Sequence, residues 1–237
     1  MIVLACILIA LVVLFLGWVW FLRNVWFHRD PDHSKTPQDD AEVRSPVYGR
    51  VAYVRRIKDG IVESEKLGEK IAIKDIAKTD WPADAPNGDG WLVGIAMTAV
   101  DVHFQYAPVA GVLGEIRHFQ TGRNLPMFDF WEYVKITYFR KGIQLFARRY
   151  TLENERQTMW IAGCKTKVGL VLIADKFIDK ITTFTKSGDA VTSGGKLSFI
   201  GRGSQVDLVI CGHPELYMKV KEGQAVYGPL TVVARLS

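Results

Sequence analysis

Three side chains in this 237-residue sequence have types that could move protons or attack a carbonyl: His103, Asp101 and Ser204. Imidazole titrates near neutrality, so His103 could both take and return a proton. Asp101 lies two residues earlier, and on an extended strand its carboxylate would share a face with His103 and could orient the ring. A serine hydroxyl becomes a good nucleophile only when a base takes its proton. Simpler interpretations stay open, namely a histidine bonded to a backbone carbonyl, an aspartate that ends a strand, and a turn serine.

The composition excludes several classes of protein. With 49% hydrophobic residues and a formal charge of only +5, the chain is too apolar and too weakly charged to be disordered. One stretch alone is apolar enough to cross a bilayer, which excludes a multi-span transporter. The cysteines, Cys6, Cys164 and Cys211, are far apart, so we expect neither a disulfide framework nor a metal site.

The elements that must position these side chains read as short strands. Runs rich in β-branched and aromatic residues, punctuated by Gly, Pro, Asn and Asp, are typical of a mainly β fold. No long helical periodicity follows Leu22. The predicted strands are Val51–Val54, Lys70–Ile73, Leu92–Met97, Val109–Ile116, Tyr133–Tyr138, Thr158–Ile161, Val168–Ile173, Val206–Ile210 and Leu230–Ala234, and residues 79–90 are predicted to form a loop.

The glycine turns between these runs are similar to those of lipoyl- and biotinyl-carrier β-sandwiches. Ser45–Val51 (SPVYGRV) and Ala107–Val112 (APVAGV) share one form, while Gly60–Gly68 (GIVESEKLG) and Lys221–Pro229 (KEGQAVYGP) share another. Glycine supplies the positive φ that tight turns require. We therefore predict a barrel-sandwich body of the carrier type, although any β-rich fold with glycine turns would share these fragments.

The segment Met1–Leu22 carries no charged side chain and predicts a membrane anchor. At about 1.5 Å per residue it would span roughly 33 Å, enough for a bilayer core of about 30 Å. Trp18, Trp20 and Trp26 gather at its far end, as interfacial aromatics do. Arg23 and Arg29 follow, which places the rest of the chain in the cytoplasm. A buried core helix is the alternative. The polar residues from 24 to 44 read as a linker.

Six segments together resemble phosphatidylserine decarboxylases, particularly the short type of bacteria and archaea. They occur in the family's order behind a membrane anchor, and the resemblance extends over nearly the whole chain. The segments are Phe27–Pro31 (FHRDP), Ser45–Val51 (SPVYGRV), Asp101–Gly111 (DVHFQYAPVAG), Asn154–Arg156 (NER), Gly203–Asp207 (GSQVD) and Lys221–Gly228 (KEGQAVYG).

This resemblance implies a self-processing pyruvoyl enzyme, with an anchor (1–23), a linker (24–44) and a catalytic domain (45–237). Cleavage would fall between Gly203 and Ser204, where glycine leaves the carbonyl open to attack. Ser204 would become the pyruvoyl cofactor, an electron sink for the carbanion left when CO2 departs. His103 and Asp101 would assist. The substrate would be phosphatidylserine or a related serine phospholipid in the membrane. We expect no nucleic-acid partner, and a homo-oligomer stays open.

The chain departs from the family pattern at Tyr48, at Arg202 and in the segment 175–177 (DKF), and the first two keep a second hypothesis open. Tyr48 occupies the place of an aspartate that the family associates with self-cleavage, and a tyrosine supplies no carboxylate near neutral pH. Its hydroxyl could still bond a histidine. Arg202 replaces a hydrophobic residue. The second hypothesis is an uncleaved, non-catalytic module that binds lipid or a membrane partner. A third, a carrier domain, lacks the exposed hairpin lysine that carriers modify. Asp101, Asp84 or Asp89 are candidates for a substitute carboxylate.

Overall fold

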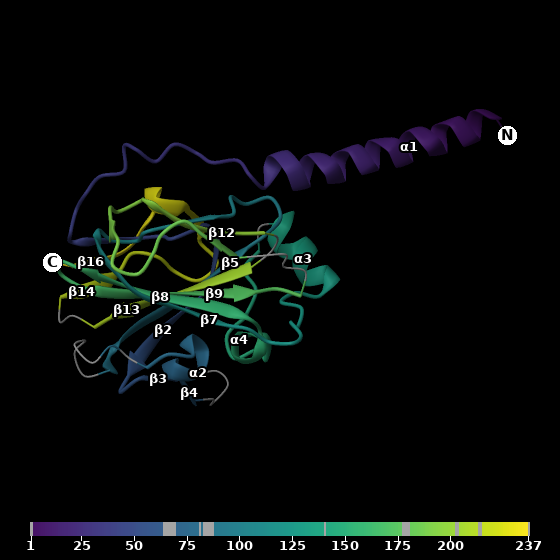
Figure 1. Ribbon diagram of the computed structural model, residues 1–237. Helices are drawn as coiled ribbons and strands as arrows, with labels where there is room; N and C mark the ends of the chain where they lie inside the picture. Colours follow the sequence, from purple (N-terminus) through teal and green to yellow (C-terminus); the bar gives the residue numbers. More distant parts are fainter. Residues whose placement is uncertain are drawn as a thin grey trace.

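A computed structural model describes the chain except for residues 1, 64–69, 81, 83–87, 140, 177–180, 202–203, 213–214 and 237. Figure 1 shows one long helix that projects from a compact body made mostly of strands. The helices are α1 (Ile2–Phe21), α2 (Ile73–Ala77), α3 (Phe130–Thr137) and α4 (Tyr150–Glu153), with a π-helical turn η1 (Leu22–Trp26) and a 3-10 turn η3 (Gly228–Leu230).

The strands form one large antiparallel sheet and two small ones. The large sheet has the order β11-β7-β8-β9-β13-β5-β2-β3-β4, with β15 also paired to β2, and the small sheets have the orders β1-β16-β14 and β10-β12-β6. The strand bounds are β1 (Glu42–Arg44), β2 (Tyr48–Lys58), β3 (Ile61–Glu63), β4 (Lys70–Ala72), β5 (Gly90–Met97), β6 (Phe104–Tyr106), β7 (Gly111–Phe119), β8 (Arg156–Gly163), β9 (Lys167–Ala174), β10 (Ile181–Thr183), β11 (Ala190–Val191), β12 (Lys196–Ile200), β13 (Ser204–Cys211), β14 (Leu216–Met218), β15 (Ala225–Tyr227) and β16 (Val232–Leu236).

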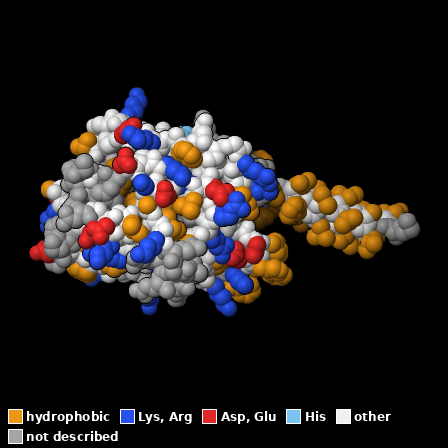
Figure 2. All heavy atoms as spheres, turned by 90° about the horizontal axis from the view of Figure 1, so that it is seen from below, with side chains coloured by type: hydrophobic (Ala, Val, Ile, Leu, Met, Phe, Trp, Pro, Cys, Tyr) orange, Lys and Arg blue, Asp and Glu red, His pale blue; other side chains and the backbone are white. Residues whose placement is uncertain are grey.

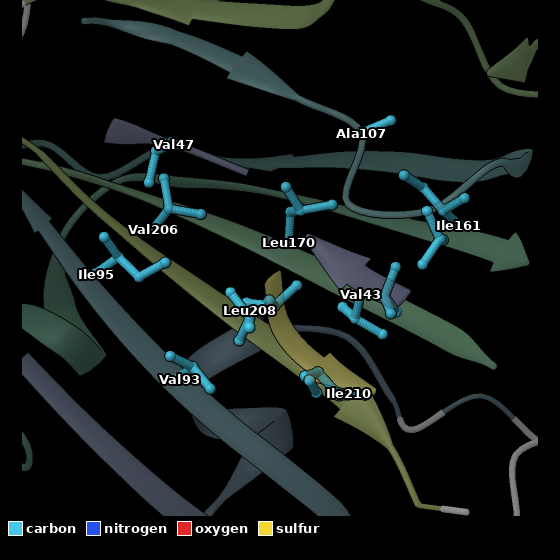
Figure 3. Close-up of a cluster of buried hydrophobic side chains, with 14 of the residues drawn as sticks. Val43, Val47, Val93, Ile95, Ala107, Ile161, Leu170, Val206, Leu208 and Ile210 are labelled. Carbon is cyan, nitrogen blue, oxygen red and sulfur yellow. The ribbon is translucent and has the colours of Figure 1, made fainter. Parts of the chain in front are cut away.

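The central strands are buried on both faces, as their nearly continuous apolar sequences anticipate. On one face, Leu208 of β13 belongs to a cluster that includes Val43 of β1 (Figure 3). On the other face, Val209 belongs to a cluster with Ile76 of α2 and Ile136 of α3. Successive residues of β13 therefore serve two separate cores. The mainly β prediction is confirmed, and the carrier-like barrel-sandwich stays a prediction.

The apolar N-terminal segment forms a helix that the body does not cover. Residues Ile2–Trp26 form one continuous helical stretch that contains an 18-residue window with a mean hydropathy of 3.2, long and apolar enough to cross a membrane. Parts of the segment predicted as a linker contact the body after this helix. Phe27 is buried, and β1 at residues 42–44 pairs with β16 in a small sheet.

One predicted strand is wrong. Residues 133–138 lie largely in α3 rather than in a strand. A capping box begins this helix, because the Asp129 carboxylate accepts from the Glu132 backbone N–H while the Glu132 side chain accepts from the Asp129 backbone N–H. The aromatic and β-branched residues of the segment fit either structure, and the box together with burial of Ile136 decides for the helix.

Candidate active site

Ser204 lies at the start of β13, in the middle of the large sheet. It pairs with Met97 at the end of β5 and with Ala174 at the end of β9, and its side chain is fully buried. The hydroxyl donates to the Met97 sulfur at 3.3 Å. A thioether is a weak acceptor, so this contact holds the hydroxyl without committing it to a strong partner. Gly203 and Arg202 lie outside the described residues.

The segment Asn154–Arg156 fixes the strand beside Ser204. The Asn154 side-chain amide donates to the Ala174 carbonyl at 2.7 Å, and the Ala174 N–H donates to the Glu155 carbonyl at 2.9 Å. Arg156 is buried and donates to backbone carbonyls, including that of Thr151 at 2.7 Å. This segment therefore anchors Ala174, the residue that pairs with Ser204, and buried Arg156 has a structural role.

His103 is buried in the connection between β5 and β6, with only one of its ring nitrogens bonded. Nδ1 lies 2.9 Å from the carbonyl oxygen of Asp101. Nε2 is buried and has no hydrogen-bond partner among the described residues. Burial lowers the His103 pKa to about 4, so the ring is neutral at pH 7. Because a carbonyl can only accept, Nδ1 carries the hydrogen and Nε2 keeps a lone pair that can take a proton.

Asp101 positions His103 in a different way from the one predicted. It lies in a turn rather than on an extended strand, and its carboxylate accepts from the backbone N–H and the hydroxyl of Thr98, both at 2.8 Å. The imidazole is held by the backbone carbonyl of Asp101 and not by its carboxylate. The side chain thus closes the turn, and the turn orients the ring.

The backbone of His103 is bonded to the strand that comes just before Ser204 in the chain. The His103 carbonyl accepts from the N–H of Ile200, the last residue of β12, at 3.1 Å. Residues 201–203 then lead to Ser204. On the other side, Met97 pairs with Ser204 and begins the turn that leads to His103. The fold therefore ties the His103 backbone to Ile200, four positions before Ser204 in the chain, and the predicted cleavage bond falls between Ile200 and β13 in the sequence.

The segment after η1 covers His103. The Phe27 ring meets the imidazole edge-on with centroids 4.5 Å apart. The Trp26 indole donates to the Val100 carbonyl at 3.2 Å, and the Arg29 guanidinium donates to the same carbonyl. Residues 26–29 therefore pack against the turn that carries His103, and the His103 side chain is fully buried.

Tyr48 bonds a histidine, but not His103. Its hydroxyl lies 2.8 Å from Nε2 of His33, whose ring also meets that of Tyr106 with centroids 4.4 Å apart. Burial raises the Tyr48 pKa and lowers the His33 pKa, which keeps both groups neutral near pH 7. Sequence reasoning missed His33, because it lies in the segment interpreted as a linker.

The carboxylates considered as substitutes for the family's aspartate have other roles or lie outside the described residues. One Asp89 carboxylate oxygen accepts from the Asp59 N–H at 3.0 Å. The Asp101 carboxylate is bonded to Thr98, and Asp84 lies outside the described residues. Among the residues described, the groups that shift the His103 pKa include no carboxylate side chain.

A polar network lies on the opposite face of β13 from Ser204. The Tyr53 hydroxyl is 2.7 Å from both Asp207 carboxylate oxygens, and the Gln205 amide donates to Asp207 at 2.6 Å. The Tyr150 hydroxyl donates to Gln205 at 2.6 Å. Burial raises the Asp207 pKa to about 6. A Cβ on Gly94 would lie 2.3 Å from the Tyr53 ring, so this glycine makes room for the network. The sequence analysis did not identify this network, although an aspartate within the apolar run after Ser204 could have indicated it.

Comparisons with known proteins agree with the resemblance in the sequence. A profile of the phosphatidylserine decarboxylase family matches residues 20–234. A putative archaetidylserine decarboxylase proenzyme of Methanocaldococcus jannaschii is 29% identical over 213 residues, which cover 90% of this chain and 89% of the relative. One from Methanothermobacter thermautotrophicus is 28% identical, covering 89% of this chain and 79% of the relative. A phosphatidylserine decarboxylase proenzyme of Ralstonia pickettii is 25% identical, with 93% and 84% covered. The chain belongs to the phosphatidylserine decarboxylase family.

Proposed function

We propose that this protein is a membrane-anchored proenzyme that cleaves itself between Gly203 and Ser204 and then decarboxylates a serine phospholipid. The observation that carries the proposal is the state of His103, which is buried and neutral, with Nδ1 bonded to a carbonyl and Nε2 unpartnered among the described residues. A buried polar atom without a partner costs free energy and calls for an explanation, and a base waiting for a proton supplies one.

In the proposed cleavage, His103 Nε2 takes the proton of the Ser204 hydroxyl. The oxygen forms an ester with the Gly203 carbonyl carbon as the amide bond between the two residues breaks, and the freed amine takes a proton. Loss of the Ser204 α-proton and rupture of its Cβ–Oγ bond release Gly203 as a C-terminal carboxylate. Water then displaces the nitrogen as ammonia, and a pyruvoyl group stays at the new N-terminus.

The residues around Ser204 fit such a group. Met97 and Ala174 hold the backbone of Ser204 from both sides, and the unpartnered Nε2 belongs to the turn that starts at Met97. Once formed, the pyruvoyl carbonyl supplies the electron sink for decarboxylation. The chain's own contribution is to fix that carbonyl at the head of β13, to exclude water with Phe27, and to hold a proton acceptor on His103.

The substrate proposal rests on the relatives and on the N-terminal helix. The relatives named above are archaetidylserine and phosphatidylserine decarboxylase proenzymes, whose substrate names share the serine headgroup and differ in the lipid to which it is attached. A bilayer is the environment that an uncovered apolar helix requires, and there the enzyme would meet its substrate in two dimensions. Arg23 and Arg29, which follow α1 in the sequence, support a cytoplasmic location for the body.

The test is the mass of the purified full-length chain under denaturing conditions, beside Ser204→Ala. Wild type should convert the 26.7 kDa chain into two pieces, the smaller running from position 204 to Ser237. The N-terminus of this smaller piece should be blocked and should react with carbonyl reagents. Ser198→Ala is a matched control, because Ser198 is also a buried serine but bonds Gln105. It should cleave like the wild type, and Ser204→Ala should stay intact.

The second candidate function is the uncleaved, non-catalytic module. The bond between Tyr48 and His33 favours it, since this pair stands where the family has a carboxylate. An intact 26.7 kDa wild-type chain that is folded in membranes would establish this alternative.

A further inference from the structure

Four large aromatic side chains on and just after α3 are exposed, and together they form what we term the aromatic patch. Phe130 is 73% exposed, Trp131 68%, Tyr138 71% and Phe139 66%. The same short segment buries Ile136 in the core. An amphipathic element with one face in the core and large aromatics on the other needs a partner for the second face.

The aromatic patch lies on the end of the body from which α1 departs. Figure 1 shows α3 at this end, and Figure 2 shows hydrophobic side chains beside Lys and Arg side chains near the base of the helix. Lys135 and Lys141 are both exposed close to the patch in sequence. Trp and Tyr with neighbouring cations are the composition that prefers the headgroup region of a bilayer.

One turn ties the aromatic patch to the base of α1. The Val100 carbonyl accepts from the Trp26 indole and the Arg29 guanidinium, at the end of the apolar helix. On α3, the Tyr133 hydroxyl lies against the backbone of Ala99. The connection 98–103 therefore holds η1 on one side and α3 on the other, so the bilayer that α1 crosses would fix the height of α3 as well.

We propose that the aromatic patch inserts into the headgroup region of the same bilayer that α1 crosses. This second contact rests on the proposed function, because it requires α1 to span a membrane, and it deepens that function by giving the body one orientation. The turn that carries His103 then lies between two attachments, close to the plane of the lipid headgroups. A tether alone would leave the body free to rotate about one point.

The test places a nitroxide at Trp131→Cys or Phe139→Cys in the full chain, reconstituted into vesicles of phosphatidylcholine and phosphatidylglycerol. The background carries Cys6→Ser and Cys164→Ser. Power saturation then compares accessibility to oxygen, which concentrates in the bilayer, with accessibility to a water-soluble nickel chelate. The matched control is Tyr217→Cys on β14, which is 41% exposed at the end of the body far from α1 (Figure 1).

Labels at 131 and 139 should favour oxygen over the nickel chelate, and the label at 217 should show the reverse. Equal chelate accessibility at 131 and 217 would overturn the proposal. Spin–spin broadening at 131 that persists on dilution with lipid would also overturn it, because a second copy of the chain would then cover the patch. The Ser204→Ala chain should give the same depths as the wild type. The depth can therefore be read even if self-cleavage fails.

Discussion

His103 and Asp207 are both buried titratable side chains near the start of β13, but their surroundings differ. Asp207 lies within a strand, and Tyr53 and Gln205 bond its carboxylate. His103 lies in a connection between strands, and its Nε2 is left unpartnered among the described residues. A buried polar group whose hydrogen bonds are all formed stabilises one packing arrangement. A buried polar group without a hydrogen-bond partner costs free energy, and that cost is recovered when the group bonds a reacting atom. The comparison indicates a structural role for Asp207 and supports the chemical role that we propose for His103.

The largest expected effect is on the rate of cleavage. His103→Gln keeps a polar side chain of similar size but supplies no base, so we expect the rate to fall by about 10²- to 10⁴-fold with the fold retained. The measurement is the time course of fragment appearance after cell-free synthesis into lipid nanodiscs. His118→Gln is the control, because His118 is paired with Glu155 at 2.6 Å and should not matter for cleavage. If His103→Gln were cleaved at the wild-type rate, His103 would not be the base in the cleavage.

The second effect is on stability. Asp207→Ala leaves the Tyr53 hydroxyl without its acceptor and leaves the Gln205 amide with only one of its two acceptors among the described residues. It also removes a negative charge that interacts with buried Arg156. We expect a loss of about 3–5 kcal/mol in the free energy of unfolding. Denaturant titration in detergent micelles measures it, with Ser204→Ala as the background so that every chain is uncleaved. A loss below about 1 kcal/mol would show that the network contributes little to the fold.

The third effect is on the pH dependence of stability, to which His103 and Asp207 contribute with opposite signs. The His103 pKa is about 4 in the folded chain against an ordinary 6.5, so folding excludes a proton there and this contribution to stability is lost as pH falls from 6.5 to 4. The Asp207 pKa is about 6 against an ordinary 3.8, so its contribution is present at low pH and is lost as pH rises from about 4 to 6.

The wild type minus His103→Gln difference in unfolding free energy should therefore rise with pH over this window. The wild type minus Asp207→Asn difference should fall. Each should span roughly 3 kcal/mol, from about 1.4 kcal/mol per pKa unit. Denaturant titrations at several pH values give both curves. Two curves with slopes of the same sign would contradict the conclusion that burial lowers the His103 pKa and raises the Asp207 pKa.

The smallest expected effect is at Tyr48. Tyr48→Phe removes the bond to His33, which we expect to cost about 1 kcal/mol of stability. The rate of cleavage should change less than about threefold, since the Tyr48 hydroxyl bonds His33 and not His103. The same nanodisc time course measures it. A loss of cleavage comparable to that of His103→Gln would instead place Tyr48 in the chemistry.

Sequence patterns predicted the longest strands of the large sheet, because a strand buried on both faces carries an apolar run that is visible in one dimension. The runs at 92–97, 168–173 and 206–210 lie in β5, β9 and β13. The segment 133–138 misled, since its aromatic and β-branched residues suit a strand and a short helix alike, and the helix begins upstream at the Asp129 capping box. In this segment, burial of side chains and the capping box decide between helix and strand, because the residue types favour neither.

The sequence by itself determined the family, the mainly β body, the apolar helix and the identity of the candidate residues, because each follows from residue types, order and periodicity. Only the tertiary structure decided what those residues contact. In the structure, the Asp101 carboxylate accepts hydrogen bonds from Thr98, Tyr48 bonds His33, and the Phe27 ring packs against His103. Some of these contacts join near neighbours and others join distant parts of the chain. Which hydrogen-bond partner a buried side chain finds depends on burial and geometry that no local pattern records.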